Sequence, residues 1–137
     1  VFCIVGDGEL NEGQCWEAFQ FIAHHRLNNL TVFVDWNKLQ LDGRLDDIIN
    51  PFNLEEKFRA FGFDVVTVKG DDIPGLLAAA QPVPPVDARP RVVLLDSVKG
   101  QGVPYLENLA NNHHLRLTDE MKETINESIR QLETEHD

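Results

Sequence analysis

The sequence begins VFCIVGDGELNEGQ at residues 1–14, and LTVFVDWN follows at residues 30–37. Each segment contains a short apolar run of the kind that forms a buried strand, and each run leads into polar residues. The first run ends in a Gly-Asp-Gly turn around Asp7, and the second leads to Asn37. If these strands are parallel neighbours, their carboxyl ends lie at one edge of the sheet, where α/β proteins bind ligands. We therefore expect Asp7 and Asn37 to face the same ligand.

The residue types in these two turns suit a hard cation and a diphosphate. Asp7 offers a carboxylate oxygen, Asn37 offers a neutral amide oxygen, and the carbonyl of Leu39 is within reach as a third ligand. Mg²⁺ prefers such oxygens in octahedral geometry and usually keeps phosphate and water among its ligands. Glycines let the backbone approach a phosphate, and the helix that follows would present unpaired N–H groups. A Gly-Asp-Gly tripeptide alone is more often an ordinary turn, so the prediction depends on both turns together.

The rest of the sequence alternates between helical and extended patterns. A first helix is predicted over residues 12–27, with Asn11 as its N-cap and Gln14 completing a capping box. A second helix is predicted to begin after Asn53 and to end at Gly62. The apolar positions of the first helix that should face the sheet are Trp16, Phe19, Ile22, Ala23 and Leu27.

Two further strands are predicted over residues 63–68 and 91–96, separated by a helix over residues 72–81. The second of these strands has a continuous apolar core, which suits a parallel sheet covered on both faces. A closing amphipathic helix is predicted over about residues 118–134, capped by Thr118. This alternation predicts an α/β fold, a three-layer sandwich with a mostly parallel central sheet.

Composition limits the classes of partner. The 137 residues include 12 basic and 23 acidic side chains, a net charge of −11. Nucleic acid and anionic membranes are therefore disfavoured as partners, and an anionic ligand would need a metal or backbone N–H groups. No apolar run is long enough to span a membrane, and Cys3 and Cys15 suit a reducing compartment as small apolar residues. We expect a cytoplasmic protein with no nucleic-acid or membrane partner.

The length suits one domain, but the sequence starts within a predicted strand and without an initiator Met. That strand, which contains Cys3, is expected to be buried. Because a strand of a parallel sheet needs neighbours, we expect upstream residues to be missing. The prediction is a partial diphosphate-binding domain over residues 1–137.

Residues 6–14 (GDGELNEGQ) and 35–43 (DWNKLQLDG) together resemble the thiamine-diphosphate motif of transketolases. The resemblance is closest to the N-terminal subunit of bacterial transketolases that consist of two chains. It extends over nearly the whole chain, including the Lys-Gly-x-Gly turn at residues 99–102. The Asp42-Gly43 pair, shortly after the Asn of the motif, favours transketolase over the similar motif of 2-oxo-acid dehydrogenase α chains.

The resemblance implies a set of site residues. A divalent metal, Mg²⁺ or Ca²⁺ or Mn²⁺ in its place, would be held by Asp7, Asn37 and the carbonyl of Leu39. The residues implied to bind thiamine diphosphate are Gly6, Asp7, Gly8, Glu9, Asn37, Leu39 and His113.

Glu12 and His113 are the catalytic candidates that the resemblance implies. Glu12 matches a family glutamate in a network linking two active sites, and Glu17 matches another acidic position near the subunit contact. Ordinary surface carboxylates remain the alternative for both. His113 best fits a family histidine that faces cofactor and substrate, although relatives often read Trp-His-Gly where this chain reads Asn-His-His. A neutral imidazole can donate to a diphosphate or to sugar oxygens, and an inert exposed histidine pair is the alternative.

The implied reaction is the transfer of a two-carbon ketol unit between sugar phosphates, in carbohydrate metabolism such as the pentose phosphate pathway. The cofactor carries the carbon chemistry and the protein positions it. In the family, a Glu on a separate pyrimidine-binding domain activates the cofactor, and nothing in this sequence corresponds to it. We therefore expect a partner, a C-terminal transketolase chain with the pyrimidine-binding domain, in a dimer or heterotetramer. The chain alone should show no ketol transfer.

Three alternatives remain open. The chain could be the α subunit of a 2-oxo-acid dehydrogenase, which shares the motif. It could belong to the xylulose-phosphate synthase type, which joins pyruvate to a triose phosphate. It could also be a non-catalytic α/β interaction module that keeps the fold, and metal-dependent cofactor binding would separate this module from the enzymes.

Overall fold

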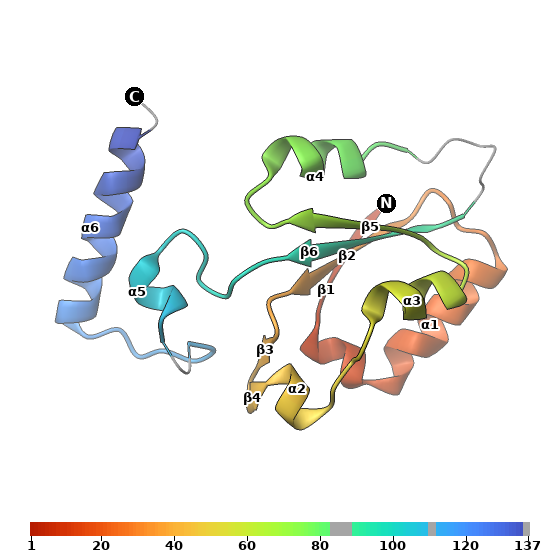
Figure 1. The fold of residues 1–137 in the computed structure, drawn as a ribbon, viewed down its shortest axis with the longest axis horizontal. Helices are drawn as coiled ribbons and strands as arrows, with labels where there is room; N and C mark the ends of the chain where they lie inside the picture. Colours follow the sequence, from red (N-terminus) through yellow and green to blue (C-terminus); the bar gives the residue numbers. More distant parts are fainter. Residues whose placement is uncertain (83–88, 110–111, 136–137) are drawn as a thin grey trace. The chain divides into compact units, whose positions relative to one another are not determined.

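The computed structural model describes residues 1–82, 89–109 and 112–135 of the chain. The chain divides into two compact units, Val1–Ser97 and Val98–Asp137. The first unit contains the sheet, and the described part of the second contains two helices (Figure 1).

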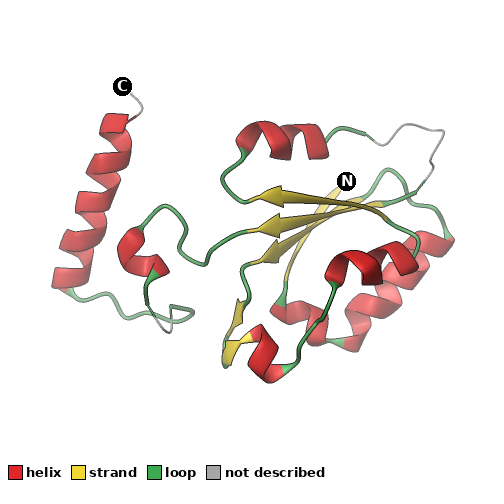
Figure 2. Cartoon of the chain, viewed as in Figure 1, coloured by secondary structure: helices red, strands yellow, loops and turns green. Residues whose placement is uncertain are grey.

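A four-stranded parallel sheet organises the first unit (Figure 2). The strands lie in the order β1-β2-β6-β5. The register pairs Gly6 with Asp35 and Trp36 with Asp96, so the carboxyl ends of β1, β2 and β6 meet at one edge. The predicted α/β class with a mostly parallel sheet is confirmed. The bounds are β1 Phe2–Gly6, β2 Thr31–Trp36, β5 Asp64–Lys69 and β6 Arg91–Asp96.

Helices cover both faces of this sheet, with α1 and α3 on one side and α4 on the other (Figure 1). Side chains alternate accordingly along β6. Val92 and Leu94 join the core beneath α1 and α3, whereas Val93 joins a second core with Ala79 of α4. The first unit is therefore the expected three-layer sandwich. The bounds are α1 Gly13–His24, α3 Leu54–Ala60 and α4 Ile73–Ala79.

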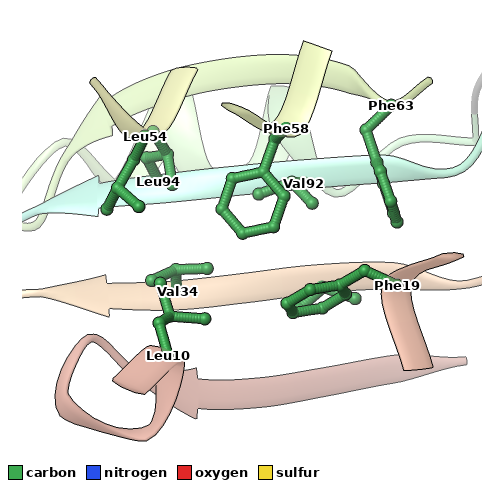
Figure 3. Packing of buried hydrophobic residues seen from close by; sticks show 9 residues of the cluster. Leu10, Phe19, Val34, Leu54, Phe58, Phe63, Val92 and Leu94 are labelled. Carbon is green, nitrogen blue, oxygen red and sulfur yellow. The ribbon is translucent and has the colours of Figure 1, made fainter. Parts of the chain in front are cut away.

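The larger core lies between the sheet and the helices α1 and α3 (Figure 3). Phe58 of α3 is fully buried, and its ring stacks on Trp16 of α1 with 5.5 Å between the centroids. The Trp16 Nε1–H also donates a 2.7 Å hydrogen bond to the carbonyl of Leu10. Because each buried Phe or Leu contributes roughly 1.5–3 kcal/mol, this core fixes both helices on the sheet. Its buried members are Leu10, Phe19, Val32, Val34, Leu54, Phe58, Phe63, Val92 and Leu94.

The first helix begins later than predicted. A 3₁₀ helix, η1 (Gly8–Asn11), follows the Gly-Asp-Gly turn and buries Leu10, so α1 begins only at Gly13. The prediction that Asn11 is the N-cap is wrong, because Glu12 holds that position without a side-chain cap hydrogen bond. Gln14 does not complete a capping box, and its amide donates a 2.6 Å hydrogen bond to the Glu12 carboxylate.

The first helix also ends earlier than predicted. Arg26 adopts a left-handed backbone conformation with φ of 50°, so α1 ends at His24. Leu27 consequently lies beyond the helix, and the prediction that it faces the sheet from α1 is wrong. Phe19 is buried, and three more of the predicted apolar positions pack against the core, which confirms the predicted face: Trp16, Ile22 and Ala23.

The predicted cap and end of α3 are confirmed, and α4 is also capped by a side chain. The Asn53 side chain accepts a hydrogen bond of 3.1 Å from the Glu56 N–H at the start of α3. Gly62, with φ of 95°, follows the end of that helix as predicted. At the start of α4, the Asp72 side chain accepts a 3.0 Å hydrogen bond from the Gly75 N–H. Helix α4 ends at Ala79, earlier than predicted.

Strand β1 is less buried than predicted. It lies at the end of the strand order beside β2, and Phe2 and Ile4 leave 62% and 73% of their surface exposed. Cys3 is exposed as well, so the expectation that this strand is buried is wrong for the described residues. Among the described strands β1 has only β2 as a neighbour, and its side chains are left largely uncovered.

A short antiparallel hairpin extends from the carboxyl end of β2 (Figure 1). Its strands are joined by a turn at Leu41 and Asp42, and Gly43 begins the second strand. The hairpin begins at Leu39, two residues after Asn37 at the edge of the main sheet, and buried Leu45 anchors the helix that follows. The bounds are β3 Leu39–Gln40, β4 Gly43–Arg44 and α2 Leu45–Ile48.

The second unit contains α5 (Pro104–Glu107) and α6 (Asp119–Glu135). The Met121 N–H donates a 3.2 Å hydrogen bond to the Thr118 hydroxyl, which confirms the predicted cap of the closing helix. Among the described residues, no helix is long and apolar enough to cross a membrane.

Candidate functional site

Asp7 lies at the carboxyl end of β1 and is 2% exposed. Its backbone N–H donates a 3.1 Å hydrogen bond to the carbonyl of Asp35 on β2. Its Oδ2 accepts a 2.6 Å hydrogen bond from the backbone N–H of Lys38, in the turn after β2. The expectation that the two turns lie together is confirmed, because parallel pairing of β1 and β2 brings both strand ends to one edge.

Burial raises the pKa of the Asp7 carboxyl. The backbone N–H groups of Lys38 and Gly8 lower this pKa again, and the nearby Asp35 charge raises it. In the described part of the chain, no ion pair reaches the Asp7 carboxylate. A buried carboxylate held by backbone donors alone is a position where a bound cation would be strongly stabilising.

The Asn37 side chain is held from both ends. Its Oδ1 accepts a 2.9 Å hydrogen bond from the Leu39 N–H, and its Nδ2 donates a 3.0 Å hydrogen bond to Oδ2 of Asp35. The amide oxygen therefore lies toward the backbone that leads to Leu39. An amide oxygen has two acceptor sites, so one remains for a further partner.

Lys38 turns the chain between Asn37 and Leu39. Its φ of 66° is left-handed, a conformation that costs a residue with a Cβ roughly 1–2 kcal/mol. The carbonyl of Lys38 accepts a 3.0 Å hydrogen bond from the Leu45 N–H. Its ammonium pairs with Asp96 and contacts the carbonyl of Ser97 at 3.3 Å. These contacts hold a strained turn directly beside Asp7.

The glycines of the first turn are close to other groups. A Cβ added to Gly8 would lie 2.9 Å from the Cβ of Gln40, which is too close for any side chain without movement. The Gly6 N–H donates a 2.6 Å hydrogen bond to the exposed carboxylate of Glu9. A diphosphate oxygen could accept a hydrogen bond from the Gly6 N–H only if the Glu9 carboxylate moved away from that N–H.

The chemistry of this edge is a set of hard oxygen donors. A buried carboxylate, an oriented amide oxygen and the backbone at Leu39 are the ligand types that Mg²⁺ accepts. In the described residues, no group of three or more His, Cys, Asp or Glu side chains is placed to hold a metal. A site here would thus depend on amide, carbonyl and phosphate oxygens in addition to Asp7.

Residues 1–131 match the family described as "Transketolase, thiamine diphosphate binding domain". The chain belongs to this family. It is 38% identical over 122 residues to the 6-deoxy-6-sulfo-D-fructose transketolase subunit SqwG of Clostridium sp. (strain MSTE9), covering 88% of this chain and 44% of that protein. It is 37% identical over 114 residues to an apulose-4-phosphate transketolase subunit from Actinobacillus succinogenes, covering 83% of this chain and 41% of that protein. The chain thus spans less than half the length of these relatives.

The fold agrees with solved transketolases. The crystal structure of transketolase from Campylobacter jejuni superposes with a TM-score of 0.76 at 26% identity, covering 95% of this chain and 20% of that one. The resemblance to transketolases that the two turns suggested is therefore confirmed.

The acidic residues that family resemblance singles out lie on or next to α1. Glu12 and Glu17 are both exposed, and the Glu12 carboxylate accepts its hydrogen bond from the Gln14 amide. An exposed position is what a subunit contact requires, and it is equally what an ordinary helix surface shows. Their roles in a transketolase remain predictions.

His113 belongs to the second unit. Its Nδ1 lies 2.5 Å from the Lys99 ammonium. The preceding Asn112 ties this loop to the Lys-Gly-x-Gly turn, since its Nδ2 donates to the carbonyls of Lys99 at 3.1 Å and Leu106 at 2.9 Å. Gly100 in that turn has φ of 82°, and a Cβ there would lie 2.7 Å from the Cβ of Leu106. Asn112 and His113 are therefore tied to the Lys-Gly-x-Gly turn, and the part of His113 in catalysis remains a prediction.

Sequence reasoning missed two polar residues at the sheet edge. Asp35, near the end of β2, accepts hydrogen bonds from Asn37 and from the Ser97 hydroxyl, the latter at 2.7 Å. Ser97 directly follows β6. Their common signal was a polar residue at or just after the carboxyl end of an apolar strand, the same signal that identified Asp7.

Proposed function

We propose that this chain is the diphosphate-binding part of a transketolase that binds thiamine diphosphate and Mg²⁺ and takes part in two-carbon ketol transfer between sugar phosphates. Family membership supports the cofactor class. The observation that best supports a metal site is the buried Asp7 carboxylate at the carboxyl edge of the sheet. Its Oδ2 accepts a hydrogen bond from the Lys38 backbone N–H.

The residues present fit a divalent metal. Asp7, Asn37 and the Leu39 carbonyl would hold Mg²⁺. Gly8 would contact the diphosphate through its backbone, as the family pattern implies. Thiamine diphosphate, when bound, supplies the carbanion chemistry of ketol transfer. The residues of this chain bind and orient its diphosphate end.

Three side chains have further proposed roles. His113 would donate a hydrogen bond to the diphosphate or to a sugar oxygen. Glu12 would join a glutamate network that links two active sites, and Glu17 would lie near the same contact. Their support is the match to the family pattern and the exposure of the two glutamates.

A partner chain is part of the proposal. Two of the relatives are named as transketolase subunits, and this chain spans less than half of each. The partner would be a C-terminal transketolase chain that carries the pyrimidine-binding domain, in a dimer or heterotetramer. Ketol transfer should then require both chains, and turnover by the purified chain alone would contradict this arrangement.

Residues 1–137 are, in this proposal, part of a larger diphosphate-binding domain. The support is the outer face of β1, where Phe2 and Ile4 are mostly exposed. Two large apolar side chains next to each other on a sheet face favour cover by further elements of the same protein. A thiol introduced on this face by Ile4→Cys should react more slowly with a thiol reagent in a longer form of the protein than in this chain.

The names of the relatives suggest which sugars to test as substrates of this protein. The relatives are named for 6-deoxy-6-sulfo-D-fructose and for apulose 4-phosphate. Both compounds should be assayed as ketol donors together with ordinary ketose phosphates, once the paired chains bind the cofactor.

The first experiment is calorimetric titration of thiamine diphosphate, with and without Mg²⁺, into this chain and into its mixture with a C-terminal transketolase chain. Binding that requires the metal supports the proposal. Asp7→Asn should weaken this binding roughly 100-fold or more, beyond the 10–100-fold typical of residues that only support a ligand. Asp47→Asn is the matched control, because Asp47 is exposed on α2.

The outcomes separate the candidate functions. No binding in any mixture would favour a non-catalytic module, and unchanged binding by Asp7→Asn would overturn the metal assignment. Decarboxylation of pyruvate with a lipoyl partner, without sugar-phosphate activity, would favour a 2-oxo-acid dehydrogenase instead.

A further inference from the structure

Asp35 occupies a junction of three strands at the sheet edge. It pairs with Gly6 of β1 and with Leu95 of β6 in the register, and its carbonyl accepts the N–H of Asp7. Its side chain is half-buried. The backbone of Asp35 therefore fixes the position of Asp7, while its carboxylate is available for a separate role.

Each oxygen of the Asp35 carboxylate has its own hydrogen-bond donor. Oδ1 accepts from the Ser97 hydroxyl at 2.7 Å, and Oδ2 accepts from Nδ2 of Asn37 at 3.0 Å. An ionised carboxylate only accepts hydrogen bonds. Because both donors belong to neighbouring side chains, the Asp35 carboxylate is well placed to orient them.

The carboxylate decides which way the Asn37 amide points. An amide rotated by 180° would set its oxygen against the Asp35 oxygen and its NH₂ group against the Leu39 N–H, which are two unfavourable contacts. In the observed orientation, Asp35 accepts from the NH₂ group and the Leu39 N–H donates to Oδ1 at 2.9 Å. The amide oxygen is thereby presented on the side that leads to Leu39.

The charge of Asp35 does not help Asp7 to ionise. Burial is the main cause of the raised pKa of the Asp7 carboxyl, and the Asp35 charge adds a smaller contribution, so without a cation the two charges oppose each other. A cation shared by Asp7 and Asn37 would relieve this cost. The same carboxylate that sets the Asn37 amide therefore adds to the negative field around the proposed metal.

We infer that Asp35 is a positioning residue that holds the Asn37 amide oxygen toward the divalent metal, with Ser97 holding Asp35 in turn. The inference rests on the proposed metal site. Residues that orient a metal ligand commonly change metal affinity by 10–100-fold when they are replaced.

The test uses the full chain with its C-terminal partner chain and measures Mg²⁺-dependent binding of thiamine diphosphate by calorimetry. Asp35→Asn has the same shape but can turn its own NH₂ group toward Asn37, so the amide is no longer held in one orientation. We expect at least tenfold weaker binding. Ser97→Ala, which leaves the Asp35–Asn37 contact in place, should weaken binding by a smaller factor.

Asp35→Asn removes a negative charge as well as a fixed hydrogen-bond acceptor, so the effect of the charge needs a separate control. Asp96 lies at the same edge, at the end of β6, and its carboxylate pairs with the ammonium groups of Lys38 and Lys69. Asp96→Asn removes the same unit of charge at this edge and does not touch the Asn37 amide, although it also frees the Lys38 ammonium from its partner. A loss as large as that of Asp35→Asn, in an Asp96→Asn variant whose Leu39 N–H keeps its wild-type protection, would show that charge alone acts and would overturn the positioning role.

A second readout does not need the metal. Amide exchange measured by NMR on the metal-free chain should show the Leu39 N–H protected in the wild type and exchanging at least tenfold faster in Asp35→Asn, because its acceptor is no longer fixed. Equal exchange rates, or binding within twofold of wild type, would overturn the inference. If the wild type binds no metal, the proposed function fails and so does the metal role of Asp35. The exchange rates would then still decide whether Asp35 fixes the Asn37 amide.

Discussion

The backbone N–H of Lys38 donates a 2.6 Å hydrogen bond to Oδ2 of Asp7, across 31 positions of the sequence. This bond joins the turn after β1 to the turn after β2. Both turns carry proposed metal ligands, and this bond fixes the spacing between them together with the bond from the Asp7 N–H to the Asp35 carbonyl. The left-handed backbone of Lys38, with φ of 66°, directs its N–H at the carboxylate.

Comparing Lys38→Gly with Lys38→Ala should reveal the strain in this turn. Both variants lose the ion pair with Asp96, but only Ala keeps a Cβ in the left-handed conformation. We expect the Gly variant to be more stable than the Ala variant by about 1 kcal/mol. Urea unfolding checks the order, and equal stabilities would mean that the turn relaxes without strain.

Gly8→Ala should destabilise the first turn. The added Cβ would lie 2.9 Å from the Cβ of Gln40, and overpacking of this kind typically costs about 1–3 kcal/mol. Gly13→Ala is the matched control, since a Cβ there meets no atom within 4 Å. Urea unfolding of the two variants gives the comparison. A Gly8→Ala variant as stable as Gly13→Ala would show that Gln40 moves away freely.

Lys99 should set the tautomer of His113. A lysine ammonium can only donate, so its 2.5 Å contact requires His113 Nδ1 to accept and places the ring proton on Nε2. Nitrogen-15 NMR of the imidazoles should show the Nε2–H form for His113 in the wild type and a mixture in Lys99→Met. His114 serves as the internal control. A wild-type His113 protonated on Nδ1 would contradict this arrangement.

Asp96 should make the folded state less stable at acid pH. Hydrogen bonds from Lys38 and then Lys69 lower the pKa of the Asp96 carboxyl below its ordinary value of 3.8. A lowered pKa means that the stabilisation is present above the ordinary value and is lost as pH falls through the lower folded value. Asp96→Asn should therefore flatten the acid side of the stability profile measured by urea unfolding, whereas Asp47→Asn should leave it unchanged. High salt should reduce the difference, because the pairs are partly exposed.

Much of the fold could be predicted because its signals are local. The apolar runs of β2 and β6, the Asn53 cap of α3 and the turn at Asp42 each depend on a few adjacent residues. Two local predictions failed because the tertiary structure, and not the local sequence, decides the outcome there. Leu10 is drawn into the core by a 3₁₀ turn, which displaces the start of α1, and β1 lies at a sheet edge, which leaves Cys3 exposed.

Residue types and their spacing predicted the α/β class and the pair of turns that contain Asp7 and Asn37, and the resemblance of these turns to the transketolase motif indicated the family. The chain displays these features directly, without any knowledge of its packing. The folded structure was needed to show that the Asp7 carboxylate is buried against the Lys38 backbone, and that Asp35 and Ser97 hold the Asn37 amide in one orientation. The contacts of Asp7 with Lys38 and of Asp35 with Ser97 join residues 31 and 62 positions apart, and strand order and register alone determine which side chains meet there.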